Sequence, residues 1–126
     1  MAIKQTVTFK TSPEKLYEAL TSAEEFSKVT GAPAEIAPDE GGAFSCFGGQ
    51  IVGRHIELVP NKRIVQAWRA GPWAESVYSI VRFDISQSGT STTLNMEHTG
   101  FPDGGAEHLE GGWHKMYWEP LKAYLE

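Results

Sequence analysis

The sequence predicts an α+β fold in which a curved antiparallel sheet wraps a long C-terminal helix. Three observations support this prediction. A strand pattern near the N-terminus is followed by two short helix signals, and the middle of the chain alternates apolar and polar residues with period two. Residues 106–125 then repeat apolar residues at steps of three and four. Segregation of strands and helices along the chain is typical of α+β domains.

The first element is a predicted strand over residues 3–10. Ile3, Val7 and Phe9 share one parity, and polar residues occupy the other. Side chains of a strand alternate between its two faces, so this pattern predicts one buried face and one wet face.

Two helices are predicted to follow this strand. Ser12 can cap the first, and Pro13 suits a first helical turn, where its missing N–H is not needed. Ser22 stands three residues before Glu25, which is the spacing of a capping box and predicts a second, shorter helix. Gly31 is expected to end that helix, because glycine readily adopts the left-handed conformation of a C-terminal cap.

Six further strands are expected to form a run of antiparallel hairpins. Turn residues at 60–62 and 87–89 separate neighbouring strands. In the clearest strand, Val77, Val81 and Phe83 share one face with Ile85. The predicted ranges are 34–38, 43–47, 50–59, 63–69, 77–86 and 91–99.

The glycine-rich stretch 40–53 contains the spacing of a phosphate-binding loop. Gly48 and Gly53 stand five positions apart, but Arg54 and His55 follow where such a loop needs Lys and then Ser or Thr. The flanking elements are predicted strands, whereas the phosphate loop precedes a helix. Paired glycines also supply the positive φ angles of tight turns, so the stretch is interpreted as a hairpin.

The final segment, 106–125, is a predicted amphipathic helix. Pro120 is expected to kink it or to remove one hydrogen bond. Its apolar face, which we expect to lie against the concave side of the sheet, comprises Leu109, Trp113, Met116, Tyr117, Leu121, Tyr124 and Leu125.

Composition excludes several classes of function. With 16 acidic and 11 basic residues in 126, the net charge is −5, which argues against a nucleic-acid partner. A single cysteine forms no internal disulfide, and no apolar run approaches the ~18 residues of a membrane span. The N-terminus lacks the apolar core of a signal peptide. We therefore expect one domain over residues 1–126 with a cytoplasmic location.

The sequence predicts no metal site and no cofactor. Among the four histidines, His108 and His114 are six residues apart on the last predicted helix, so they do not share a face. Cys46 is interpreted as a half-buried strand residue, because a nucleophilic cysteine needs a nearby cation or histidine to hold its thiolate.

Aromatic residues are concentrated in the second half of the chain, and two interpretations remain open. The rings can fill the space between helix and sheet, or some can line a cavity for an apolar ligand. Exposed rings around Trp73 would instead mark a protein-binding patch. For the cavity, the candidate ligand-binding residues are Phe44, Trp68, Arg69, Trp73, Tyr78, His98, Trp113 and Tyr117.

An ordered set of short motifs resembles the C-terminal domain of the Aha family, the activators of the ninety-kilodalton heat-shock chaperone. The likeness extends over residues 3–125. Its parts are Gly31-Ala32-Pro33-Ala34, Gly41-Gly42-Ala43-Phe44, Gly49-Gln50-Ile51-Val52-Gly53, the run from Leu58 to Arg69, Trp73, Gly112-Trp113, and Tyr117-Trp118-Glu119-Pro120-Leu121-Lys122. This resemblance implies a START-like, helix-grip fold, in which many members hold hydrophobic ligands between sheet and helix and some catalyse reactions there.

Three functions follow as hypotheses. The chain could be a chaperone-associated stress-response protein, with an exposed patch around Trp73 and the 100–105 turn. It could bind a hydrophobic small molecule in a cavity of several hundred Å³, the usual size of ligand pockets. Alternatively it could be a small cavity enzyme, cyclase- or hydrolase-like, for which Tyr78, Glu97 and His98 are the candidate acid–base residues. Binding is preferred over catalysis.

Overall fold

The structure, a computed structural model, describes residues 2–126. One strand, two helices, six strands and a long C-terminal helix follow one another, which confirms the predicted order. The elements are β1 (Ala2–Phe9), α1 (Pro13–Thr21), α2 (Ala23–Thr30), β2 (Glu35–Ile36), β3 (Ala43–Cys46), η1 (Phe47–Gly49), β4 (Ile51–Val59), β5 (Arg63–Ala70), β6 (Ser79–Ser88), β7 (Ser91–Thr99), α3 (Ala106–Gly112), η2 (Trp113–Trp118) and α4 (Glu119–Leu125).

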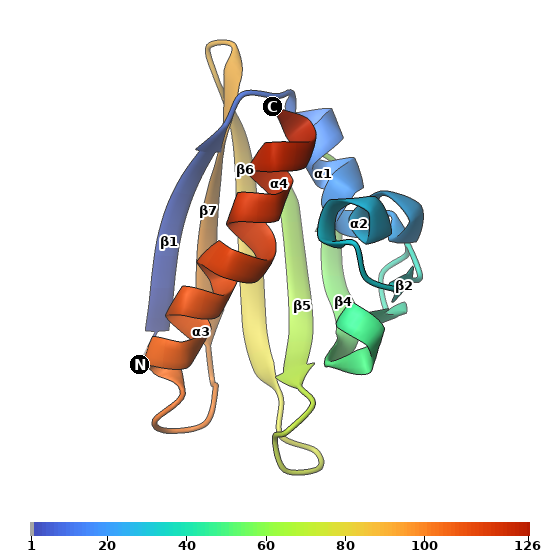
Figure 1. The fold of residues 1–126 in the computed structure, drawn as a ribbon, viewed down its shortest axis with the longest axis vertical. Helices are drawn as coiled ribbons and strands as arrows, with labels where there is room; N and C mark the ends of the chain where they lie inside the picture. The colour runs from blue at the N-terminus through green and yellow to red at the C-terminus, as the bar shows by residue number, and fades with distance from the viewer. Residues whose placement is uncertain (1) are drawn as a thin grey trace.

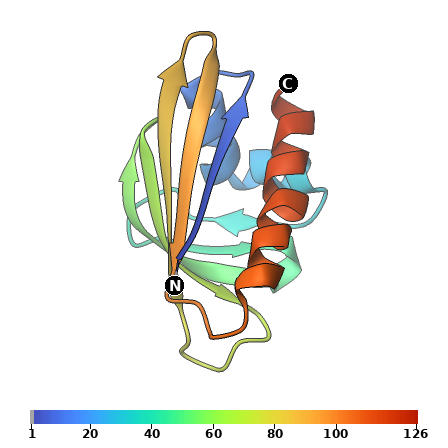
Figure 2. The same ribbon diagram turned by 90° about the vertical axis from the view of Figure 1, so that its left-hand side faces the viewer.

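The seven strands form one antiparallel sheet in the order β1-β7-β6-β5-β4-β3-β2. The sheet curves, and α3, η2 and α4 run as one long helix across its concave side, with α1 and α2 beside them (Figures 1 and 2). A single cluster of buried apolar side chains fills the space between the two layers. The predicted helix-on-sheet architecture is therefore confirmed.

Local capping signals determine the ends of the two short helices. The Ser12 hydroxyl accepts a hydrogen bond from the backbone N–H of Lys15, and Ser22 does the same for Glu25. Gly31 ends α2 with a left-handed φ of 72°. Each predicted cap is present, because these signals act within three or four residues of the helix end.

Strand boundaries agree with the predictions to within one residue except at two places. The segment 34–38 forms only the two-residue edge strand β2, and the segment 77–86 becomes a strand only from Ser79. Before it, the Val77 N–H donates to the Ala74 carbonyl and Ser76 adopts a left-handed φ of 69°. Because the Val77 N–H is used in this turn, Val77 does not join the hydrogen-bond ladder between β5 and β6.

The glycine-rich stretch forms a hairpin, as predicted. Gly48 and Gly49 have φ angles of 66° and 95° in the turn between β3 and β4. A Cβ atom at Gly53 would overlap the carbonyl oxygen of Ala67 on β5 and lie 2.7 Å from the Phe44 ring. Glycine is therefore required here by close approach of the backbone and a core ring.

The long helix buries Leu109, Trp113, Tyr117 and Leu121 as predicted, but it differs from the prediction at three other positions. Met116 and Tyr124 are exposed, whereas Trp118 is buried. The cause is the π-helical turn η2, in which the Glu119 N–H bonds to the carbonyl five residues back, at His114. The extra residue in this turn lets the adjacent Tyr117 and Trp118 both face inward while Met116 faces outward. Pro120, which has no N–H to donate, follows Glu119.

Within residues 2–126, no helix combines the length and the apolar character needed to cross a membrane.

Candidate functional site

The interior between sheet and helix gathers six of the eight candidate ligand-binding residues. Trp73 among them is half-buried and packs against Trp68 at a ring separation of 5.6 Å. Phe44, Trp68, His98, Trp113 and Tyr117 are buried.

Trp113 is the centre of this aromatic cluster. Its ring stacks on that of Trp118 at 5.5 Å with 17° between the planes, and lies 5.6 Å from Trp68. The Tyr117 ring is 4.4 Å away, and the Phe83 ring from β6 meets it edge-on at 5.7 Å. The π turn makes this possible, since it turns Trp113, Tyr117 and Trp118 toward the sheet together.

His98 joins the cluster to the sheet through a chain of hydrogen bonds. The Trp113 indole N–H donates to His98 Nδ1 over 3.1 Å. The Ser79 hydroxyl lies 2.7 Å from His98 Nε2 and donates to the Trp68 carbonyl over 3.1 Å. An indole nitrogen can only donate, so Nδ1 carries no proton and Nε2 must be the protonated nitrogen.

This tautomer determines what the Ser79–His98 pair can do. A general base must accept the serine proton at the nitrogen facing the hydroxyl, but here that nitrogen already holds a proton. Burial also lowers the pKa of His98 to about 4, which keeps the ring neutral. With Trp113, the pair is therefore arranged to tie the helix to the sheet rather than to activate a nucleophile.

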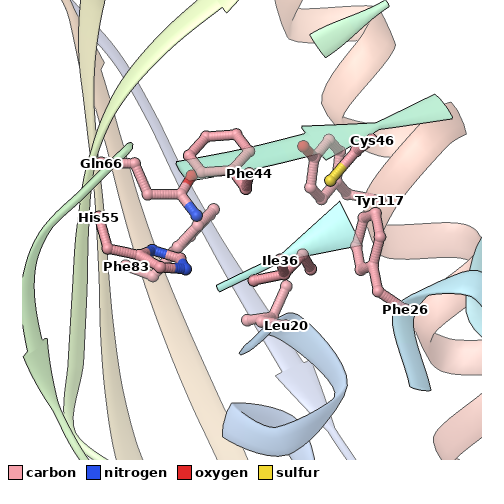
Figure 3. A pocket seen from close by; sticks show the side chains of 9 residues that line it. All are labelled: Leu20, Phe26, Ile36, Phe44, Cys46, His55, Gln66, Phe83 and Tyr117. Carbon is pink, nitrogen blue, oxygen red and sulfur yellow. The ribbon is translucent and has the colours of Figure 1, made fainter. Parts of the chain in front are cut away.

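The enclosed space between the layers is small. The pocket drawn in Figure 3 has a volume of about 10 Å³. A cavity of this size has room for about one water molecule. This volume is far below the several hundred Å³ predicted for a ligand cavity, and aromatic side chains occupy much of the space between the layers. The lining residues are Leu20, Phe26, Ile36, Phe44, Cys46, His55, Gln66, Phe83 and Tyr117.

His55 is the unusual residue of this pocket. It is 1% exposed, and within the described chain neither ring nitrogen has a hydrogen-bond partner. It faces Gln66 directly across the β4–β5 ladder, so the two polar side chains lie together at one end of an otherwise apolar slot (Figure 3). Burial lowers the pKa of His55, so its ring is neutral.

Cys46 occupies the other end of the same pocket. It is 4% exposed, and burial raises the pKa of its thiol to about 12. Burial likewise raises the pKa of the neighbouring Tyr117 hydroxyl. A thiol held protonated in this way is not a nucleophile, which agrees with its interpretation as a strand residue.

The other two candidate ligand residues, Arg69 and Tyr78, lie on the outer face of the sheet. Tyr78 is 51% exposed, and the Arg69 guanidinium lies 5.6 Å from the centre of its ring. Glu97 also points outward, where it pairs with Lys4 at 3.6 Å. The three proposed acid–base residues, Tyr78, Glu97 and His98, are thus on opposite sides of the sheet and do not form a common site.

The sequence analysis missed Ser79 and Gln66 as interior polar groups. Ser79 has the same parity as Val81 and Phe83, and Gln66 the same parity as Ile64 and Trp68, so both face the core. The alternation of side chains predicts that both residues face the core, where each is a candidate hydrogen-bond partner for His98 or His55.

Comparison with known proteins agrees with this architecture. The family model described as Activator of Hsp90 ATPase homolog 1-like protein matches residues 10–126. The human protein "Activator of 90 kDa heat shock protein ATPase homolog 1" is 36% identical over 115 residues, which are 91% of this chain and 34% of that protein. The mouse homolog 2 is 32% identical over 100% of this chain and 38% of its own length. The chain thus spans about a third of these relatives.

Solved structures extend the likeness to chains of similar length. "PFC0360w, an HSP90 activator from plasmodium falciparum" superposes with a TM-score of 0.93 at 28% identity, covering 99% of this chain and 96% of that one. CalU16 from Micromonospora echinospora shares the fold with a TM-score of 0.84 at 19% identity, over 99% of this chain and 76% of its own. The fold is the START-like helix grip, and the chain belongs to the family of Activator of Hsp90 ATPase homolog 1-like proteins.

Proposed function

We propose that this chain is an accessory protein of a ninety-kilodalton heat-shock chaperone and that it binds the chaperone through its surface. The observation that carries the proposal is the match of nearly the whole chain to a Plasmodium falciparum protein described as an HSP90 activator. The match covers 99% of this chain and 96% of that solved chain. The expected cytoplasmic location belongs to this proposal.

The interior supports a binding role in preference to a catalytic one. The pocket of about 10 Å³ has no room for a substrate, and His98 carries its proton on the nitrogen that faces Ser79. Catalysis in the pocket would need the pocket to enlarge, and catalysis at Ser79 would need the other tautomer of His98. Recognition of a partner needs only the outside of the molecule.

The proposal is tested by titrating the chain into the chaperone of its own host, with calorimetry and the chaperone's ATPase rate as readouts. We expect saturable binding and a faster ATPase rate. Human activator homolog 1 serves as the positive control for a competent chaperone preparation. Absence of binding under conditions where that control binds would contradict the proposal.

A small amphiphilic molecule in the interior is a second candidate, favoured by the unpaired ring nitrogens of His55. A buried polar group without a partner costs about 1–3 kcal/mol, and a ligand with one polar group and an apolar body would satisfy it. At a volume of about 10 Å³, the pocket would have to open by a shift of the long helix. Phe44, Trp68, Trp113 and Tyr117 would then contact the ligand's apolar part.

Native mass spectrometry of protein purified gently from its own host tests this second candidate. A bound ligand should appear as a discrete added mass that disappears on denaturation and is reduced in His55→Leu. Met116→Leu, which changes an exposed side chain on the long helix, is the control. Protein from the host that carries no added mass would count against ligand binding.

A further inference from the structure

The outer face of the sheet divides into two halves of different chemistry, both free of helices (Figure 2). Strand register aligns outward side chains in rows across the strands, where directly opposite neighbours have Cβ atoms about 4.5–5.5 Å apart. One row is Glu57, Val65, Arg82, Glu97 and Lys4. A second row is Arg54, Ala67, Ile80 and Thr99, and beside it Arg69 faces Val52.

In the first half, every charge is neutralised by a neighbour. Asp84 accepts a hydrogen bond from Arg63 over 2.8 Å, and its other carboxylate oxygen pairs with the Arg82 guanidinium at 3.0 Å. Arg63 also lies 3.6 Å from Glu57, and Lys4 lies 3.6 Å from Glu97. This half therefore leaves no unmatched charge for a partner, although it contains a shallow hollow of about 290 Å³.

In the second half, the cations lack acidic partners. Among residues 2–126, no carboxylate lies within 4.0 Å of the Arg54 or Arg69 guanidinium. Arg54 donates to the Gly41 carbonyl over 2.9 Å, and Arg69 donates to the carbonyls of Trp73 and Ala74, each over 2.9 Å. A chain of net charge −5 thus keeps two unneutralised arginines on one strip of surface.

Exposed apolar side chains lie beside these two arginines, on the side toward β6. Tyr78 is 51% exposed and Ile80 is 43% exposed. The partly exposed Ala67 stands between Ile80 and Arg54 in the register, and the partly exposed Val52 faces Arg69. The carbonyl bonds of Arg69 and its stacking on Tyr78 hold one cation and one ring in place. Exposed apolar side chains beside cations without acidic partners are complementary to a segment that carries apolar residues beside carboxylates.

We infer that this strip, defined by Val52, Arg54, Ala67, Arg69, Tyr78 and Ile80, is a docking surface for an acidic amphipathic segment of a partner protein. The segment's apolar side chains cover Ile80 and Tyr78, and its carboxylates pair with Arg54 and Arg69. The inference deepens the proposed chaperone-accessory function by naming the contacting face, and so rests on it for the identity of the partner. The chemistry of the strip does not depend on that identity.

The test uses NMR titration of the ¹⁵N-labelled chain with a short synthetic peptide of alternating leucine and glutamate. We expect chemical-shift changes on the outward residues of β4, β5 and β6, and weaker binding at high salt. An alternating leucine–lysine peptide is the matched ligand control and should bind much more weakly. Ile80→Glu should weaken binding more than about tenfold, since it removes an apolar contact and adds a repelling charge. Arg54→Gln should weaken it about two- to fivefold.

Ser86→Glu is the matched control for Ile80→Glu, because it places the same charge on an exposed, outward position of the same strand. It should leave peptide affinity within about twofold, as expected for a distant exposed charge. Equal binding of the two peptides, or unchanged affinity in both Ile80→Glu and Arg54→Gln, would overturn the inference. A chain that dimerises through this strip, and becomes monomeric on Ile80→Glu, would overturn it in favour of self-association.

A chaperone titration with the same variants separates the two proposals. If the chaperone binds wild type and Ile80→Glu equally, the accessory function stands and the docking surface is wrong. If the acidic peptide binds at the strip but the chaperone does not bind at all, the surface stands and the accessory function is wrong.

Discussion

Trp113→Ala should lower the free energy of unfolding by about 3–5 kcal/mol, the range for removing a large buried aromatic side chain. Trp113 is 2% exposed and contacts rings from both the helix and the sheet. Its loss leaves a cavity and deprives His98 Nδ1 of its donor. Since domains of this size are stable by about 5–15 kcal/mol, the change takes a large part of the total.

Urea unfolding followed by near-ultraviolet circular dichroism measures this effect. Met116→Ala is the matched control, because Met116 lies in the same π turn but is exposed, and it should change stability by about 0.5 kcal/mol or less. If Trp113→Ala proves too unstable to purify, Trp113→Phe tests the same contact. It keeps much of the ring volume and loses the N–H bond. A loss under about 1 kcal/mol for Trp113→Ala would contradict the helix-grip packing described here.

The sequence predicts element order and helix ends because their signals are local. Ser12, Ser22 and Gly31 act on backbone groups within one turn of helix, and turn residues separate the hairpins. These interactions do not depend on distant parts of the chain. The order of elements then leaves few topologies open. In the observed sheet, β2 to β7 pair in chain order and β1 pairs with β7.

The inward face of the long helix could not be predicted in the same way. Regular helical spacing places Met116 inside, but the π turn adds one residue and buries Tyr117 and Trp118 together. The gain comes from rings on distant strands, such as Phe83, which no local pattern reveals. The alternation of apolar and polar residues along the strands also does not determine whether the space between sheet and helix is filled or hollow. Inward side chains have the same spacing in both cases.

The outward position of Arg69 and Tyr78, in contrast, was available from the sequence. Arg69 follows the inward Trp68, and Tyr78 has the opposite parity to Val81, so neither can share the inner face of its strand. Both were assigned to the cavity for their chemistry rather than their register. The same two residues now define part of the unneutralised strip, so register also redirects the functional hypothesis from the interior to the surface.

Acidification should destabilise the protein mainly through His98. The effect is expected between the ordinary histidine pKa and the lowered pKa of His98, which is about 4. The unfolded chain binds a proton on this ring below about pH 6.5, whereas the folded chain stays neutral until about pH 4. Stability is therefore retained above the unfolded pKa and falls as pH drops toward the folded one. The difference corresponds to about 3 kcal/mol, at about 1.4 kcal/mol per pH unit. His55, whose pKa burial also lowers, adds to the effect in the same direction.

Comparing wild type with His98→Gln across this pH range isolates the contribution of His98. The variant loses the hydrogen-bond chain at neutral pH, but it has no ring to protonate, so its disadvantage should shrink by about 3 kcal/mol between pH 7 and pH 4. His108→Gln removes an exposed histidine of α3 and should run parallel to wild type. If the stability gap between wild type and His98→Gln stayed constant with pH, then His98 would not be held neutral. The Trp113–His98–Ser79 connection between helix and sheet would then need a different proton arrangement.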